Sequence, residues 1–112
     1  MKEISWQEFE QVELRTGTIV EVHDFPEARK PAWKLVIDFG EAMGSRKSSA
    51  QITDLYSRED LLGKQIIAVT NFPPKQIGPV ISECLVTGFV QADGSVVLAC
   101  PDRATANGLK LS

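Results

Sequence analysis

A run of polar residues interrupted by prolines offers the clearest chemistry in this chain, at residues 71–85. Asn71, Lys75, Ser82 and Glu83 supply hydrogen-bond donors, hydrogen-bond acceptors and charge. Three prolines stiffen the segment, which also contains a glycine and lies between two stretches typical of strands. Polar groups on a stiff loop between strands are suited to bind a partner outside the fold. The alternative is a plain connection whose prolines only lower the entropy of the unfolded chain.

Residues that could support catalysis are sparse. His23 is the single histidine, and it has Asp24 beside it but no nucleophile motif nearby. A nucleophilic Cys84 would need a base and an orienting group, and His23 is the one histidine that could serve. Glu59 and Asp60 fall in the first turn of a predicted helix, where carboxylates stabilise the helix dipole. We therefore expect a binding protein and not an enzyme.

Signatures of metal and cofactor binding are equally sparse. No pair of residues has the spacing of metal ligands, and Gly40 and Gly44 lie in a predicted hairpin turn instead of a strand-to-helix junction. The sequence therefore predicts no metal and no cofactor. Cys84 and Cys100 stand alone in apolar surroundings typical of strands, which predicts reduced, buried thiols and a cytoplasmic protein.

Basic residues gather in one part of an acidic chain. The net charge of the 112 residues is −3, which argues against indiscriminate nucleic-acid binding, because such binding relies on neutralising phosphates. Residues 1–27 carry a net charge of −5, residues 28–47 carry +3, and the remainder carries −1. Such a patch indicates a localised anionic partner, or else a solvated face that keeps the protein soluble. The basic set comprises Arg29, Lys30, Lys34, Arg46, Lys47 and Lys75.

Hydrophobic periodicity predicts the elements that must position these groups. Strands or extended segments are expected at residues 14–25, 33–39, 45–53, 65–71, 81–89 and 95–100. Gly17 within the first strand indicates a bulge or bend. One short helix is expected at residues 5–11, where Ser5 and Glu8 fit a capping box. A second is expected at residues 57–63, with Ser57 as its N-cap.

The length and the order of these elements predict one domain, residues 1–112. Five or so strands with a short helix between the third and fourth favour an all-β, five-stranded Greek-key barrel, the OB-fold, whose faces and loops bind oligonucleotides. An SH3-like barrel is the structural alternative. No apolar run approaches the roughly 18–20 residues of a membrane span, and polar residues follow Met1 where a secretory signal would be apolar. We therefore expect no membrane insertion.

Six segments follow one another in order along nearly the whole chain: residues 14–20, 25–29, 34–40, 48–53, 71–75 and 82–85. Together they resemble the bacterial CsaA family. These export-related chaperones are built on the tRNA-binding domain, an OB-fold module that also occurs as an appendix of some methionyl-tRNA synthetases. In the wider family Asn, Lys and Ser occupy the positions of Asn71, Lys75 and Ser82. The stretch after the lysine is more basic there, whereas residues 76–80 here are uncharged, which suits an apolar client.

The resemblance implies a homodimer that binds unfolded or pre-export polypeptides without ATP and assists secretion. The alternative is a structure-specific tRNA-binding protein that binds RNA with the same surface of the OB-fold that would hold a polypeptide. A scaffold that recruits another protein through an exposed strand edge is a third possibility.

Particular residues are assigned to this surface. The basic set would form its charged rim. Asn71 and Ser82 could instead satisfy the local backbone, as polar side chains beside prolines often do. The expected peptide-binding groove comprises Phe25, Trp33, Phe72 and Ile77. The expected polar contacts are Ser48, Asn71, Ser82 and Glu83. The expected dimer interface comprises Trp6, Phe9, Leu109 and Leu111.

Overall fold

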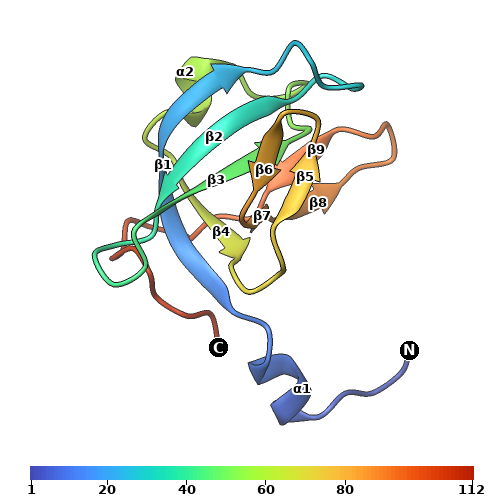
Figure 1. The fold of residues 1–112 in the computed structure, drawn as a ribbon. Coiled ribbons are helices and arrows are strands. Elements are labelled where there is room, and N and C mark those ends of the chain that lie inside the picture. The colour runs from blue at the N-terminus through green and yellow to red at the C-terminus, as the bar shows by residue number, and fades with distance from the viewer.

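The computed structural model describes residues 1–112 and is built around an antiparallel barrel (Figure 1). Its main sheet has five strands in the order β3-β2-β1-β4-β7. Two separate hairpins, β5–β6 and β8–β9, extend from the barrel. The strands are β1 (Leu14–Asp24), β2 (Trp33–Asp38), β3 (Ser45–Ala50), β4 (Gln65–Val69), β5 (Lys75–Ile77), β6 (Val80–Ser82), β7 (Leu85–Val86), β8 (Gly88–Val90) and β9 (Val96–Leu98).

The long strand β1 organises the barrel because it pairs with two partners. Its first half pairs with β4 and its second half with β2. The register with β2 shifts between Ile19 and Glu21, so a bulge lies there and not at Gly17. Gly17 instead avoids a steric clash. A Cβ atom there would lie 2.6 Å from a methyl group of Ile37 and 2.8 Å from the ring of Phe39, which is too close for any side chain. The glycine lets β1 pass close over the core.

The core lies inside the barrel and is built from alternate residues of its strands. Ile19, Leu35, Ile37 and Phe39 are almost completely buried. The bulge in β1 changes which face its residues present, so Ile19 and Val22, three apart in the sequence, both reach this core.

Hydrogen bonds between β3 and the segment after β6 nearly close the barrel. The backbone N–H of Glu83 donates to the carbonyl of Lys47 over 2.8 Å. The hydroxyl of Ser48, which is buried, donates to the carbonyl of Cys84 over 3.0 Å. This closure confirms the predicted five-stranded barrel.

Two short helices lie at the predicted positions. Helix α1 (Trp6–Glu10) precedes the barrel, and its capping box joins Ser5 and Glu8. Helix α2 (Arg58–Leu61) lies between β3 and β4, begins with a capping box made by Ser57 and Asp60, and buries Leu61. Neither helix has the length and apolar character needed to cross a membrane.

The predicted strand at residues 81–89 is wrong as a single element. The structure divides this stretch among β6, β7 and β8, because Glu83 leaves the hairpin to bond with Lys47 of β3. The predicted loop at residues 71–85 likewise contains a hairpin. Gly78 has a φ of +58°, which suits the first central position of the two-residue turn between β5 and β6.

The C-terminal segment returns to the start of β1 instead of fraying. The N–H of Leu111 donates to the carbonyl of Leu14 over 2.8 Å, and the N–H of Thr16 donates to the carbonyl of Leu109 over 3.1 Å. The ammonium group of Lys110 also donates to the carbonyl of Glu10. The C-terminal segment and the end of α1 therefore lie side by side (Figure 1).

Candidate ligand-binding surface around the β5–β6 hairpin

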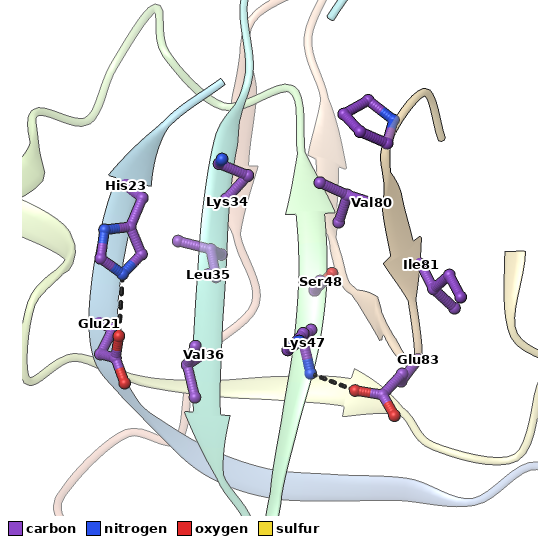
Figure 2. Close-up of a pocket in the computed structure, with 11 residues that line it drawn as sticks. Glu21, His23, Lys34, Leu35, Val36, Lys47, Ser48, Val80, Ile81 and Glu83 are labelled. Carbon is purple, nitrogen blue, oxygen red and sulfur yellow. Dashed lines mark hydrogen bonds and ion pairs between the residues drawn. The ribbon is translucent and has the colours of Figure 1, made fainter. Parts of the chain in front are cut away.

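The β5–β6 hairpin separates two grooves. The first, here called the charged groove, has a volume of about 600 Å³ and lies between β6 and the face of the sheet formed by β1, β2 and β3 (Figure 2). The second, here called the apolar groove, has a volume of about 570 Å³ and lies along β5. The charged groove is lined by Glu21, His23, Lys34, Leu35, Val36, Lys47, Ser48, Pro79, Val80, Ile81 and Glu83. The apolar groove is lined by Phe72, Pro73, Pro74, Lys75, Gln76, Ile77, Ser82, Cys84 and Leu85.

Two lysines are left without carboxylate partners in the charged groove. Glu21 is paired with His23, whose Nε2 lies 2.8 Å from the Glu21 Oε1 (Figure 2). The carboxylate of Glu83 accepts a hydrogen bond from the backbone N–H of Lys47. Neither Lys34 nor Lys47 takes part in an ion pair. The groove can therefore offer two ammonium groups to an anionic ligand.

The apolar groove combines exposed hydrophobic side chains with one charge. Phe72 is 55% exposed and Leu85 is 50% exposed, while Ile77 is half-buried. Lys75 is the only charged residue among those that line the groove. Burial raises the pKa of the Cys84 thiol to about 11, so this sulfur stays protonated at neutral pH and is unsuited to nucleophilic attack.

The structure distributes the predicted basic set over several places. Lys34 and Lys47 line the charged groove, and Lys75 lines the apolar groove. Arg29 and Lys30 are exposed in the connection between β1 and β2 and line neither groove. Arg46 points elsewhere: its Nη1 donates to the carbonyl of Thr70 over 2.7 Å.

All four predicted polar residues hydrogen-bond to the backbone of the chain itself. The Asn71 amide accepts from the N–H of Glu13 and donates to the carbonyl of Gln11, over 3.0 and 2.7 Å. Ser82 donates to the carbonyl of Cys84 over 3.2 Å. Ser48 and Glu83 make the closing bonds described above. These side chains hold the hairpin, β3 and the N-terminal segment in place.

The four residues expected to form one groove lie apart. Phe72 and Ile77 share the apolar groove. Phe25 is only 5% exposed and lies beneath Lys34, whose ammonium group is 5.6 Å from the ring centre. Trp33 is half-buried against the core, and its Nε1 donates to the carbonyl of Tyr56. Phe25 and Trp33 therefore contribute to the body of the fold beside the grooves.

Sequence reasoning missed several residues that line the grooves. Leu85 ends the polar run, and both it and Ile81 fall within the single strand predicted at residues 81–89, where no groove is expected. The sequence context of His23 raises only the question of catalysis, whereas the residue lines the charged groove. The Gly78–Pro79 turn was the available signal, because a two-residue turn predicts the hairpin that forms both grooves. The structure contains no cluster of three His, Cys, Asp or Glu residues suited to a metal ion.

A nearly closed five-stranded barrel with grooves between its sheet face and an extended loop is the architecture of an OB-fold binding module. Residues 14–110 match the family described as "Putative tRNA binding domain". The crystal structure of the chaperone CsaA from Bacillus anthracis superposes with a TM-score of 0.93 at 47% sequence identity, covering 99% of this chain and all of that one. The CsaA chaperone protein from Picrophilus torridus gives 0.91 at 49% identity, covering 98% and 100%. The chain belongs to the CsaA family of tRNA-binding-domain proteins.

More distant similarity extends to methionine–tRNA ligases. The enzyme from Methanocaldococcus jannaschii is 32% identical over 111 residues, which are 99% of this chain. The chain spans only 17% of the length of that relative. The similarity therefore concerns a segment about the size of this barrel and not the whole ligase.

Proposed function

We propose that this protein is a homodimeric chaperone that binds unfolded or pre-export polypeptides without ATP. The observation that carries the proposal is the apolar groove, where Phe72 and Leu85 stay about half exposed in the folded chain. Burying the exposed part of such a side chain against a client contributes roughly 1 kcal/mol. A folded client has buried its own apolar residues already, so the groove favours unfolded segments.

The lysines around the hairpin support the same function. Positive charge lies on both sides of the hairpin, with Lys75 in the apolar groove and the unpaired Lys34 and Lys47 in the charged groove. This arrangement speeds the encounter with acidic clients. Lys47 and Lys75 are exposed and Lys34 is half-buried. Because salt screens charges that solvent reaches, the apolar contacts would supply most of the affinity at moderate ionic strength.

The proposed dimer interface lies at the other end of β1. Trp6 is 84% exposed, and Leu109 and Leu111 are also exposed on the C-terminal segment beside α1. A two-fold partner would cover this apolar surface, together with the half-buried Phe9. Two grooves in one dimer would hold a long client by avidity. The free thiols of Cys84 and Cys100 fit the proposed cytoplasmic location, and assistance to secretion follows from the family resemblance.

A holding assay tests this function. A chemically unfolded client is diluted into buffer of moderate salt with a stoichiometric excess of the protein, and light scattering follows aggregation with and without ATP. We expect suppression of scattering that ATP does not change. Aggregation at the rate of the client alone would end the proposal.

A second candidate function is structure-specific tRNA binding. The match of residues 14–110 to the tRNA-binding domain and the unpaired Lys34 and Lys47 favour it. Binding of this kind should weaken steeply with salt. Total tRNA, titrated at low and at moderate salt in a filter-binding assay, tests this function. No binding at low salt would exclude it.

A further inference from the structure

The outer edge of β5 is an unpaired strand edge beside the apolar groove. β5 belongs to a two-stranded sheet in which β6 is its only partner, and β6 lies between β5 and β3 (Figure 1). Lys75 and Gln76 are exposed along this edge. A free edge of this kind is a template for pairing with another chain.

The hairpin geometry identifies which backbone groups face outward. In a two-residue turn, the flanking residues Ile77 and Val80 form a hydrogen-bonded pair. Pairs alternate along an antiparallel ladder, so Gln76, opposite Ile81, occupies a non-hydrogen-bonded position. The N–H and C=O of Gln76 therefore point away from β6, toward the free edge.

We propose that a client segment binds as an added strand on β5, making a three-stranded sheet with β5 and β6. This inference rests on the proposed chaperone function and specifies how the polypeptide is held. The backbone of the client would exchange hydrogen bonds with the N–H and C=O of Gln76. Alternate client side chains would then point into the apolar groove, against Phe72, Ile77 and Leu85.

The composition of the groove defines the class of segment that fits. Apolar walls with Lys75 as the only charge select an extended segment in which an apolar residue has an acidic neighbour. Backbone pairing does not depend on sequence, so many different unfolded chains can use it. A folded client whose strands are already paired offers no free backbone, and a proline at the paired position lacks the N–H.

Two substitutions at one residue separate backbone pairing from side-chain contact. Gln76→Pro removes the outward N–H but no bond to β6, and proline is tolerated where a strand edge faces solvent. Gln76→Ala removes the side chain and keeps the N–H. The probe is a fluorescent ten-residue peptide of alternating leucine and threonine with one central aspartate. We expect Gln76→Pro to weaken its binding about fivefold to tenfold, and Gln76→Ala by less than about twofold. Thermal melting checks that both variants fold.

Two modified peptides give an independent test on the unmodified protein. One carries N-methyl groups on its odd-numbered residues and the other on its even-numbered residues, so only one of them blocks the N–H groups that face β5. We expect one peptide to lose binding and the other to keep it. Equal binding of both, or wild-type affinity in Gln76→Pro, would overturn strand addition while the proposed chaperone function stands. Failure of the wild-type protein both to bind the parent peptide and to suppress aggregation would end the two proposals together.

Discussion

Glu83 and Lys47 are joined twice across the closing edge of the barrel. The N–H of Glu83 donates to the carbonyl of Lys47 over 2.8 Å, and the N–H of Lys47 donates to the Glu83 carboxylate over 2.9 Å. The side chain of Glu83 thus supplies an acceptor that a regular strand pair would take from the backbone. It ties the base of the β5–β6 hairpin, and with it both grooves, to β3.

The first prediction concerns this acceptor. Glu83→Ala leaves the N–H of Lys47 without its partner and should lower the free energy of unfolding by about 1–2 kcal/mol. Glu83→Gln keeps an oxygen acceptor and should cost less. Urea unfolding measures both, and Glu21→Ala, which removes only an exposed partner of His23, is the matched control. Unfolding of Glu83→Ala at the wild-type midpoint would contradict the role assigned to this side chain.

The second prediction concerns the apolar groove. Phe72→Ala removes one of the two large hydrophobic side chains exposed in the groove and should weaken suppression of client aggregation, with little change in melting temperature. Phe89 on β8 is 68% exposed but does not line the groove, so Phe89→Ala is the matched control and should protect like the wild type. An equal loss of aggregation suppression in the two variants would mean that any exposed aromatic residue can bind clients, and it would contradict a specific role for the apolar groove.

Local sequence signals predict the barrel because each acts over a few residues. Alternating apolar residues mark β1 and β2, and a continuous apolar run marks β4. The Ser5–Glu8 and Ser57–Asp60 pairs mark the starts of both helices. The hairpin within residues 71–85 has only its Gly78–Pro79 turn as a local signal, because β5 has only three residues and follows two prolines. Strands this short are specified by their partners, and those partners become known only in the folded chain.

The roles of polar residues are harder to predict than the strands. Asn71 has a polar side chain on a loop, as a ligand-binding residue often does, yet its amide hydrogen-bonds to the backbone at Gln11 and Glu13. These partners lie about sixty positions away in the sequence, so no local pattern reveals them. Arg46 likewise has the charge expected of a rim residue, yet it donates a hydrogen bond to the carbonyl of Thr70. Residue type alone cannot distinguish a side chain that builds a site from one that faces its ligand.

The third prediction tests tRNA binding at the charged groove. Lys34→Ala and Lys47→Ala should each lower the salt dependence of any tRNA binding, by about one in the slope of log affinity against log salt concentration. Both lysines are unpaired and line the groove, whereas Arg103 is exposed and paired with Asp102, so Arg103→Ala is the control. Filter binding at several salt concentrations gives the slopes. Unchanged slopes in both lysine variants would place any tRNA contact elsewhere on the molecule.

The fourth prediction concerns acid stability. Hydrogen bonds from Lys110 and then Arg15 lower the pKa of Glu13 to about 2 from its usual 4.5. A folded-state pKa below the unfolded value means that the stabilisation is complete above about pH 4.5 and is lost as the pH falls toward 2. Glu13→Gln should therefore flatten the decline of stability in this range. Midpoints of urea unfolding, measured between about pH 4.5 and pH 2, test this prediction. Glu3→Gln, at an exposed glutamate, is the control. A parallel decline in Glu13→Gln and the wild type would contradict the assignment.

The fifth prediction concerns the proposed dimer. The Glu13–Lys110 ion pair, 2.7 Å long, and the strand pairing of the C-terminal segment hold Leu109 and Leu111 beside α1, which carries Trp6. If a second copy covers this surface, Trp6→Ala combined with Leu109→Ser should convert the dimer to monomers. The barrel should stay folded, since neither side chain belongs to its core. Val90→Ser, on an apolar residue of β8 that is 76% exposed, should leave the mass unchanged. Light scattering coupled to gel filtration gives the mass of each, and a dimeric double variant would place the interface elsewhere.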